Sequence, residues 1–338
     1  MSHTGIGKFR PLDPNGQECP TDFLLYNFDI GGATLKPAHE TFLEQGITSI
    51  LAANDEHKVR LVGRASRSGP DSLNLNLSRQ RAETVAAFLT RAGIARNRIQ
   101  IDFLGESKPF STANESEDDR SVEIHLQISP TLTIELEDGW LVRPASVMVL
   151  TIREAFAPIA LQAGRKLQIH LGSGIATGRG DLNLHFDSSG QETRPCAGIL
   201  IFGNEGGGGI FVGAHESLRV CSGPVQSVDD PSDIDYGSQL EHVFENGEPE
   251  FARFVGNTCV HELAHIIAKI EHNADPDNFM FSVGSLGGNL PRDRRTRETM
   301  RHHWGGPKTF NSDQIKRMVC AMHTGYFSGG EKFKFVRP

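Results

Sequence analysis

The sequence predicts an α+β protein that is divided into two domains. With 338 residues the chain is long enough for two domains that each bury a core. In the first part, strand-like and helix-like patterns follow one another in the order β-α-β-α-β-β. The second part is organised around one apolar helix with the sequence His-Glu-x-x-His. We therefore expect a flexible arm at residues 1–20, a first domain at 21–130 and a second domain at 131–338.

The composition is that of an ordinary soluble globular protein, with 22% charged and 38% hydrophobic residues. A formal net charge of −8 argues against nucleic acid as a partner. We expect no transmembrane segment, because no apolar run approaches the roughly eighteen residues that one needs. The N-terminal residues also lack the apolar core of a standard secretory signal. Of the five cysteines, Cys196 could pair with Cys221 and Cys259 with Cys320, or all five could be buried thiols.

The elements of the first domain are read from hydrophobic periodicity. Residues 1–20 are polar and carry several prolines and glycines, which predicts a loosely held arm. Pro37 opens the first helix. Gly93 ends the second, whose apolar residues recur on one side. The predicted strands lie at 23–30, 58–66, 98–105 and 120–128, and the predicted helices at 37–53 and 77–94.

Several spaced residues accompany this order of elements. They are Gly63, Gly69, Asn74, the run LSRQRA at 77–82 and the run DRSVEI at 119–124. With them, residues 23–128 resemble the OmpA-like peptidoglycan-association domain. The resemblance implies peptidoglycan, or another envelope or secretion component, as the partner. In that family an Asp after the strand and the Arg of the LSxxRA helix hold the diaminopimelate of the cell-wall peptide, and Arg81 matches this Arg.

The sequence departs from the family pattern at the Asp. Ser66 occupies its place, within a run that adds Arg64 and Arg67. A carboxylate that would pair with the ligand's ammonium group is therefore missing, and two cations are added. We expect the domain to keep its fold and to bind the cell wall weakly, or to serve only as a docking module.

The second domain begins with a strand and turn at 131–144, which we interpret as the join between the domains. The glycine run at 203–209 lacks the Lys-Ser or Lys-Thr and the helix of a phosphate-binding loop, so we interpret it as a cleft rim. The acidic stretch 228–250 predicts a surface loop, with calcium binding as the less favoured alternative. Ser312 is the expected N-cap of the last helix. The predicted helices lie at 145–164, 297–304 and 310–323, and the predicted strands at 166–174, 180–190 and, as two short pieces, within 198–216.

The helix around residues 257–270 carries the clearest chemical signal. His261 and His265 are four residues apart, so a helix places both imidazoles on one face, where they can bind one ion. Glu262 lies beside the first of them, as in the zinc-hydrolase sequence HExxH. Apolar residues around the three predict a helix held in a core, where a charged Glu needs a partner such as a metal. The alternative is a buried helix with two hydrogen-bonded histidines.

The residues after this helix point to the third metal ligand. His272, followed by Asn278 and Met280, resembles the metzincin-type metallopeptidases, in which the chain turns after the third ligand and a methionine lies beneath the metal. The family pattern HExxHxxGxxH has its third His where this chain has Glu271. We choose His272 because its interval to the methionine fits the family. Glu271 stays an alternative, and Glu298, in the manner of gluzincins, is a weaker one.

The position of the third ligand constrains where the helix ends. In a continued helix, His272 would lie about 10 Å along the axis from His265, too far to share an ion bound at about 2 Å. We therefore expect the helix to end near Lys269.

The residues and the resemblance together predict a metzincin-like mixed α/β domain with the activity of a zinc-dependent endopeptidase. Zn²⁺ would polarise the scissile carbonyl of a protein or peptide substrate and acidify a water, with Glu262 as general base. One alternative is a non-catalytic envelope or peptidoglycan-associated binding protein with a degenerate protease domain. Another is a secreted, toxin-like effector protease. The cell envelope, or export without a signal peptide, is favoured over a strictly cytoplasmic location.

Overall fold

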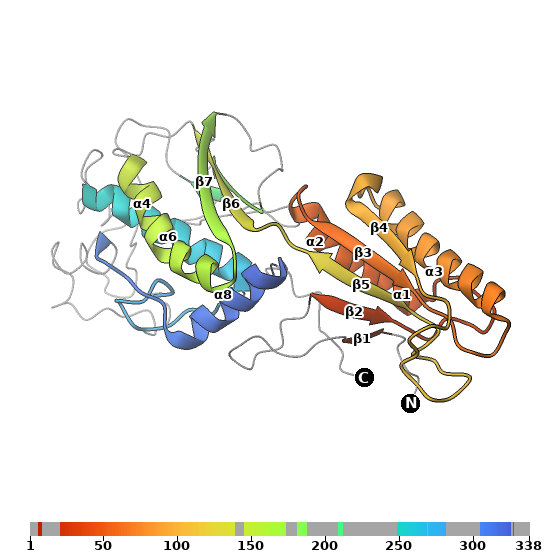
Figure 1. Cartoon of the computed structure of the whole chain (residues 1–338). Coiled ribbons are helices and arrows are strands. Elements are labelled where there is room, and N and C mark those ends of the chain that lie inside the picture. The colour runs from red at the N-terminus through yellow and green to blue at the C-terminus, as the bar shows by residue number, and fades with distance from the viewer. Residues whose placement is uncertain are drawn as a thin grey trace. The chain divides into compact units, whose positions relative to one another are not determined.

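The chain forms two compact units, which are described separately here. The computed structural model describes residues 6–8, 21–138, 145–173, 181–187, 209–211, 249–268, 270–281, 305–325 and 327. The first unit extends to Pro130 and includes a short C-terminal piece, and the second begins at Thr131. Figure 1 shows each unit as a sheet with helices beside it.

A five-stranded sheet forms the first unit. Its order is β1-β2-β5-β3-β4, in which β3 and β4 run parallel and the other neighbours antiparallel. Along β5 the side chains alternate, so Val122, Ile124 and Leu126 are buried in the core while Glu123 and His125 lie on the opposite face. The strands are β1 (Ile6–Lys8), β2 (Asp22–Leu25), β3 (Lys58–Gly63), β4 (Ile99–Phe103) and β5 (Val122–Gln127).

Helices cover the apolar face of this sheet. One helical stretch runs from Pro37 to Ala53, with a π-helical middle, and a longer helix supplies buried Ala82, Val85 and Leu89. These side chains join those of β2, β3 and β5 in a single core. The helices are α1 (Pro37–Phe42), η1 (Leu43–Thr48), α2 (Ser49–Ala53), α3 (Asp71–Arg91) and the short η2 (Arg96–Arg98).

The first unit follows the predicted order of elements, with three differences. The strand predicted at 23–30 ends at Leu25, because Asn27 adopts a left-handed conformation with φ of 64°. Helix α3 begins six residues earlier than the apolar periodicity suggests, directly after Pro70. Residues Ile6–Lys8, expected in a loose arm, pair with β2, so the arm is held there.

The second unit contains a parallel sheet of four strands in the order β7-β6-β8-β9. The stretch that we interpreted as a join contains β6, which lies between β7 and β8 and buries Leu132, Ile134 and Leu136. That interpretation is wrong for 131–138, since the sheet is built on this strand. The strands are β6 (Thr131–Asp138), β7 (Lys166–Ser173), β8 (Leu182–Asp187) and β9 (Gly209–Phe211).

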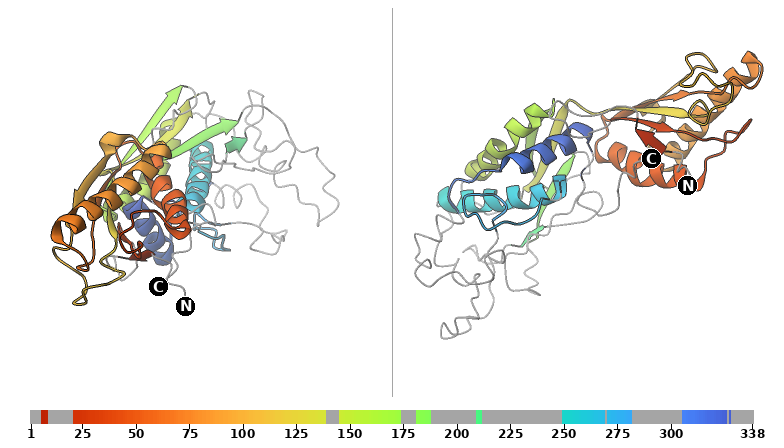
Figure 2. Two further views of the ribbon diagram at one scale, coloured as in Figure 1. Left: turned by 90° about the vertical axis from the view of Figure 1, so that its right-hand side faces the viewer. Right: turned by 90° about the horizontal axis from the view of Figure 1, so that it is seen from below.

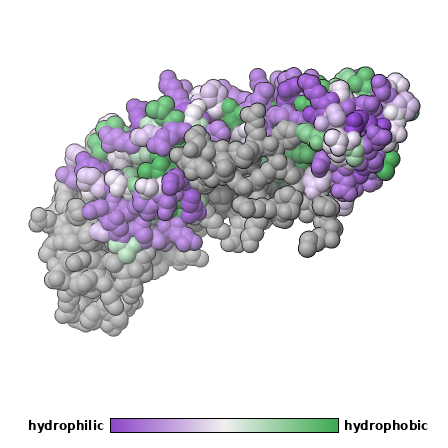
Figure 3. All heavy atoms as spheres, turned by 60° about the horizontal axis from the view of Figure 1, so that its bottom comes forward, coloured by the Kyte–Doolittle hydropathy of each residue, from purple (hydrophilic) through white to green (hydrophobic). Residues whose placement is uncertain are grey.

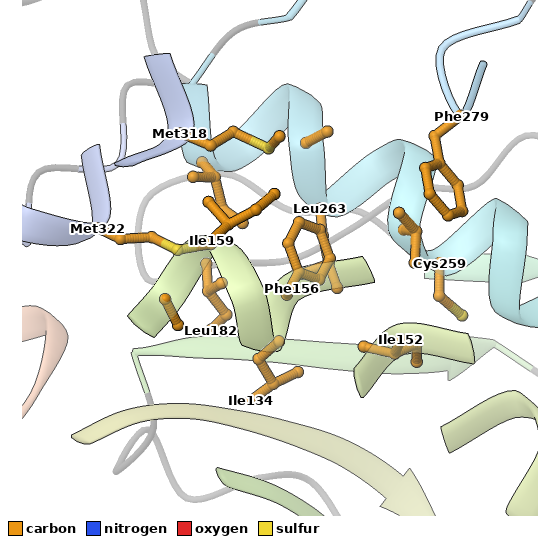
Figure 4. Close-up of a cluster of buried hydrophobic side chains, with 14 of the residues drawn as sticks. Ile134, Ile152, Phe156, Ile159, Leu182, Cys259, Leu263, Phe279, Met318 and Met322 are labelled. Carbon is orange, nitrogen blue, oxygen red and sulfur yellow. The ribbon is translucent and has the colours of Figure 1, made fainter. Parts of the chain in front are cut away.

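Three helices pack in the core of the second unit, namely α4 (Ala145–Gln162), α6 (Pro249–Ala268) and α8 (Ser312–Thr324). Figure 4 shows Phe156 of α4 beside Leu263 of α6, with Met318 and Met322 of α8 nearby. Gly256 allows α4 and α6 to approach closely, because a Cβ atom there would lie 2.7 Å from Thr151 Cβ. Helices α4 and α6 pack against each other, and they are drawn in yellow-green and cyan in Figure 2.

Helix α4 is apolar enough to raise the question of a membrane. Among the described residues it alone is long and apolar enough to cross one, by length and composition only, a test that buried core helices also pass. One of its faces is buried against α6 and β7 through Met148, Ile152 and Phe156, whereas Leu150 and Leu161 are exposed. In the view of Figure 3, the apolar side chains of the described residues are scattered among hydrophilic ones.

The ends of two helices test the expected boundaries. Helix α6 ends at Ala268, which confirms the predicted end near this position. The N-cap of α8 is Asn311 and not Ser312, because Asn311 Oδ1 accepts the Gln314 N–H at 2.9 Å while Gln314 Oε1 accepts the Asn311 N–H at 2.9 Å. The helix predicted at 297–304, residues 203–208 of the glycine run and most of the acidic stretch 228–250 lie outside the described residues, while Gly209 begins β9.

Candidate metal centre and cell-wall site

Helix α6 places two imidazoles on one side, as the spacing predicts. Its inner face is formed by Val260, Leu263 and Ile267, which are buried in the second core. His261 and His265 are half-buried at the edge of this packing, and their Nε2 atoms are 3.1 Å apart. Core packing therefore holds α6 in place, and the helix in turn sets the positions of His261 and His265.

The turn after α6 brings His272 back to this pair. Its Nε2 atom lies 3.0 Å from that of His261 and 3.1 Å from that of His265. Within the described residues, these three form the one group of histidine, cysteine or acidic side chains that could hold a metal ion. His272 is exposed, so the group opens toward solvent on that side.

The group fits a zinc ion by distance. Three nitrogens that bind zinc at about 2.0–2.1 Å in a tetrahedral arrangement would be about 3.3 Å apart. The observed separations of 3.0–3.1 Å are close to this value. Three imidazole nitrogens and one open side are also the donor set of hydrolytic zinc centres.

Hydrogen bonds on the far side of the rings support the same reading. His261 Nδ1 donates to the Phe279 carbonyl at 2.8 Å, and His265 Nδ1 donates to the Ile270 carbonyl at 2.5 Å. A carbonyl only accepts, so the proton of each neutral ring is on Nδ1 and the lone pair on Nε2. The lone pairs of His261 and His265 then face each other at 3.1 Å. A shared cation would satisfy all three rings.

The three rings are held in the neutral form that a metal requires. Burial lowers the pKa of His261 to about 3, and burial also lowers the pKa of His265 and of His272. At neutral pH the rings are therefore mostly uncharged, which is the form that binds a metal.

The other predicted residues of this centre have different positions. Glu262 lies on α6 between the two histidines, but its side chain is outside the described part of the structure, as is Glu298. Glu271 is exposed and does not join the group of three. Met280 is completely buried, and its carbonyl accepts the N–H of Asn273, next to His272.

Lys308 belongs to this region and was missed by the sequence reasoning. Its Nζ donates to the Pro276 carbonyl at 2.5 Å. Burial lowers the pKa of Lys308 to about 8, while Asp277 and Asp275 act in the opposite direction. Its charge also contributes to the low pKa of His261. No local pattern marks this lysine, because it reaches the site through the pairing of its neighbour Thr309 with Asn278.

In the first unit, Arg81 lies inside the domain. Its side chain is completely buried, and the guanidinium donates to the carbonyls of Gly32, Arg64 and Asp29 at 2.8–2.9 Å. Burial lowers its pKa to about 10, so it remains charged at neutral pH. In this arrangement its donors are used to join the loop after β2 to the end of β3, and its role toward a ligand stays a prediction.

A carboxylate does lie at the position where the family Asp is missing. Ser66 Oγ donates to Glu115 Oε2 at 2.9 Å, and the same carboxylate is hydrogen-bonded to Arg120. A residue that is 49 positions away in the chain therefore brings a carboxylate to Ser66. The pattern around Ser66 could not reveal it.

The two added cations are also engaged. Arg64 forms a buried ion pair with Glu123 and donates to the Lys108 carbonyl. Arg67 donates to three successive carbonyls at residues 111–113. Both therefore hold the loop between β4 and β5, the loop that carries Glu115, and the charge of Arg64 is paired with that of Glu123.

The cysteines correct one expected pairing. Cys259 is a buried thiol on α6 and is not joined to Cys320. Cys320 is disulfide-bonded to a cysteine outside the described residues. Cys196 and Cys221 lie outside them as well.

Comparison with known proteins identifies the first unit. Residues 27–123 match the OmpA family. The chain is 37% identical over 129 residues to the probable lipoprotein YiaD of Escherichia coli (strain K12), a match that covers 37% of this chain and 57% of YiaD. It is 32% identical over 102 residues to outer membrane protein A of Bordetella avium, covering 29% and 52%. The chain thus spans only about half of each relative's length.

Structural comparison gives matches of the same kind. The peptidoglycan-associated lipoprotein of Burkholderia pseudomallei is 21% identical, with a TM-score of 0.30, and the match covers 34% of this chain and 97% of that protein. From the family match and the sequence relatives, we conclude that an OmpA-like domain of mixed α/β structure occupies the N-terminal region.

Proposed function

We propose that this is an envelope-associated protein that docks through its OmpA-like domain and holds zinc in a hydrolytic centre in its second unit. The docking part is supported by relatives named as outer membrane proteins and lipoproteins. The zinc part is carried by one observation, the triangle of Nε2 atoms from His261, His265 and His272 at 3.0–3.1 Å. The mixed α/β second unit would then be a metzincin-like domain.

The chain supplies the groups that peptide hydrolysis needs. Bound zinc would act as a Lewis acid that polarises a carbonyl and acidifies water. The three neutral imidazoles would hold it, and the Nδ1 protons of His261 and His265 are committed to backbone carbonyls. Glu262, on the same helix, would accept the proton of the attacking water and return it to the leaving amine. A protein or peptide with an extended backbone would be the substrate.

In the OmpA-like domain, Glu115 would supply the carboxylate for a cell-wall ammonium group. It takes the place of the family Asp beside Ser66, while buried Arg81 keeps the loop after β2 in position. Binding to peptidoglycan would then depend on Glu115. A pull-down with purified sacculi tests this: Glu115→Gln should lose the binding of the wild-type chain, whereas Glu117→Gln, in the same loop, should keep it. Equal recovery of both variants would contradict this assignment.

Elemental analysis tests the metal centre directly. The purified full chain, incubated with zinc and desalted, should retain about one zinc per chain. Loss of the ion in a His261→Ala, His265→Ala double variant, and retention in a variant of the exposed His170, would assign it to the triangle. A folded wild-type chain that retains no zinc would refute the enzyme proposal.

A second candidate function is a non-catalytic, envelope-associated binding protein. The relatives favour it, because their names describe outer membrane proteins and lipoproteins. In that case zinc would bind as a structural ion and Glu262→Gln would change no measured activity. A secreted, toxin-like effector protease is the third candidate. Unlike the binding protein, it would damage a target cell, and the Glu262→Gln variant would not.

A further inference from the structure

Two backbone carbonyls orient the imidazoles of the metal centre. The Phe279 carbonyl accepts the Nδ1 proton of His261, and the Ile270 carbonyl accepts that of His265. Both carbonyls belong to the segment 270–281, which has no regular helix or strand of its own. The orientation of the two imidazoles therefore depends on the contacts that hold this segment in place.

The side chain of Asn278 organises the turn next to Phe279. Its Oδ1 accepts the Met280 N–H at 2.9 Å, and its Nδ2 donates to Gln314 Oε1 at 2.9 Å. Both side chains are buried, with 4% of Asn278 and 7% of Gln314 exposed. A buried amide must be paired, because leaving one unpaired costs about 1–3 kcal/mol. The contact with Gln314 thus fixes the orientation of Asn278, and with it the turn.

Gln314 is itself rigidly held. It is the third residue of α8 and forms reciprocal hydrogen bonds with the N-cap Asn311. The same helix buries Met318 and Met322 against α4 and α6, as Figure 4 shows. One turn further along α8, Arg317 donates to the Ala268 carbonyl at 2.6 Å, where α6 ends. Helix α8 therefore contacts both the end of α6, before the segment 270–281, and Asn278 within that segment.

We propose that Gln314 is a positioning residue for the metal centre. Through Asn278 it fixes the turn whose Phe279 carbonyl holds the His261 ring with its Nε2 atom toward the other two histidines. Arg317 holds the end of α6 two residues before Ile270, and its contribution is smaller because its side chain is exposed. This inference rests on the zinc centre proposed above, and it assigns α8 to that centre although no residue of α8 is a ligand.

Variants of Gln314 in the full chain test the proposal. Gln314→Met keeps the side-chain length and removes the acceptor, so it should weaken zinc binding about 10-fold, the lower end of the effect of direct partners of metal-ligating histidines, because Gln314 acts through Asn278. Gln314→Glu keeps an oxygen acceptor for Asn278 and should bind zinc within about threefold of the wild type. Lys316→Met, on the exposed side of the same helix, is the matched control and should have no effect.

Two readouts separate positioning from general destabilisation. Zinc affinity is measured by competition with a chelator, and the visible spectrum of the cobalt-substituted protein reports the geometry around the ion. Circular dichroism confirms that each variant is folded. If Gln314→Met does not fold, Gln314→Asn replaces it, because its shorter side chain cannot reach Asn278 and should weaken zinc binding equally.

The outcomes are distinct. A wild-type chain that binds no zinc refutes the metal centre itself and this inference with it. If the wild type binds zinc and Gln314→Met binds it equally well with an unchanged cobalt spectrum, only the positioning role is refuted. It is also refuted if Gln314→Glu loses as much affinity as Gln314→Met, since the acceptor would then not be the cause.

Discussion

Replacing His272 with alanine should remove most of the zinc affinity of the second unit. Its Nε2 atom lies 3.0 and 3.1 Å from those of His261 and His265, so it completes the set of three nitrogens. Structural zinc sites with four ligands bind with roughly 10–16 kcal/mol, which is about 2.5–4 kcal/mol for each ligand. At about 1.4 kcal/mol for each factor of ten, losing one ligand should weaken binding by two to three orders of magnitude.

The neighbouring Glu271→Ala provides the matched comparison. Glu271 is exposed and outside the group of three, so its removal should change zinc affinity by less than about threefold. His170→Ala, at an exposed position on β7, controls for the loss of any imidazole. Affinity is measured by chelator competition on the full chain. If Glu271→Ala releases the ion and His272→Ala retains it, the assignment of the third ligand is wrong, and the resemblance to metzincins needs a shift of one residue here.

The remaining predictions concern catalysis, pH and packing. Glu262→Gln should retain zinc but lower peptide hydrolysis at least about a hundredfold, and near-normal turnover would remove Glu262 from its role as base. Hydrogen bonding to Glu123 and then to Asp22 raises the pKa of His125 against the effect of burial. The resulting stabilisation is complete below the unfolded pKa of about 6.5 and is lost as pH rises through the folded pKa. The free energy of unfolding of the first unit, measured with urea, should therefore fall from pH 6 to pH 8. In His125→Gln it should depend less on pH, and an unchanged pH dependence would contradict this role of His125. Gly63→Ala would place a Cβ atom 1.8 Å from the Ser78 carbonyl oxygen and should lower the free energy of unfolding by at least about 3 kcal/mol. Gly93→Ala, with φ of 95° but open space around it, should lower it by only about 1 kcal/mol. Similar losses in the two variants would refute the packing argument.

The sequence was sufficient to predict the helices and strands whose hydrophobic residues recur at a regular spacing. Alternation along 120–128 predicted a strand with Val122, Ile124 and Leu126 on its inner face, and the structure confirms it. The four-residue spacing of His261 and His265 placed them on one face of a helix. The fold of the OmpA-like domain could be predicted in the same way, because each of its elements carries its own periodic pattern.

What depends on distant parts of the chain was decided only by the tertiary structure. The sequence left Ser66 without a carboxylate, and the fold supplies Glu115 from a loop 49 residues away. Strand β6 could be recognised as a strand, but its central place in the second sheet depends on partners from β7 and β8.

The metal centre combines both kinds of information. The sequence determined its two helical histidines, because helical periodicity relates residues within one turn. The approach of His272, the burial of Lys308 and the contact of Gln314 with Asn278 follow from where the chain turns after Ala268 and from how α8 packs against α6. Those positions are set by core packing between segments that are far apart in the sequence, and no local pattern records such packing.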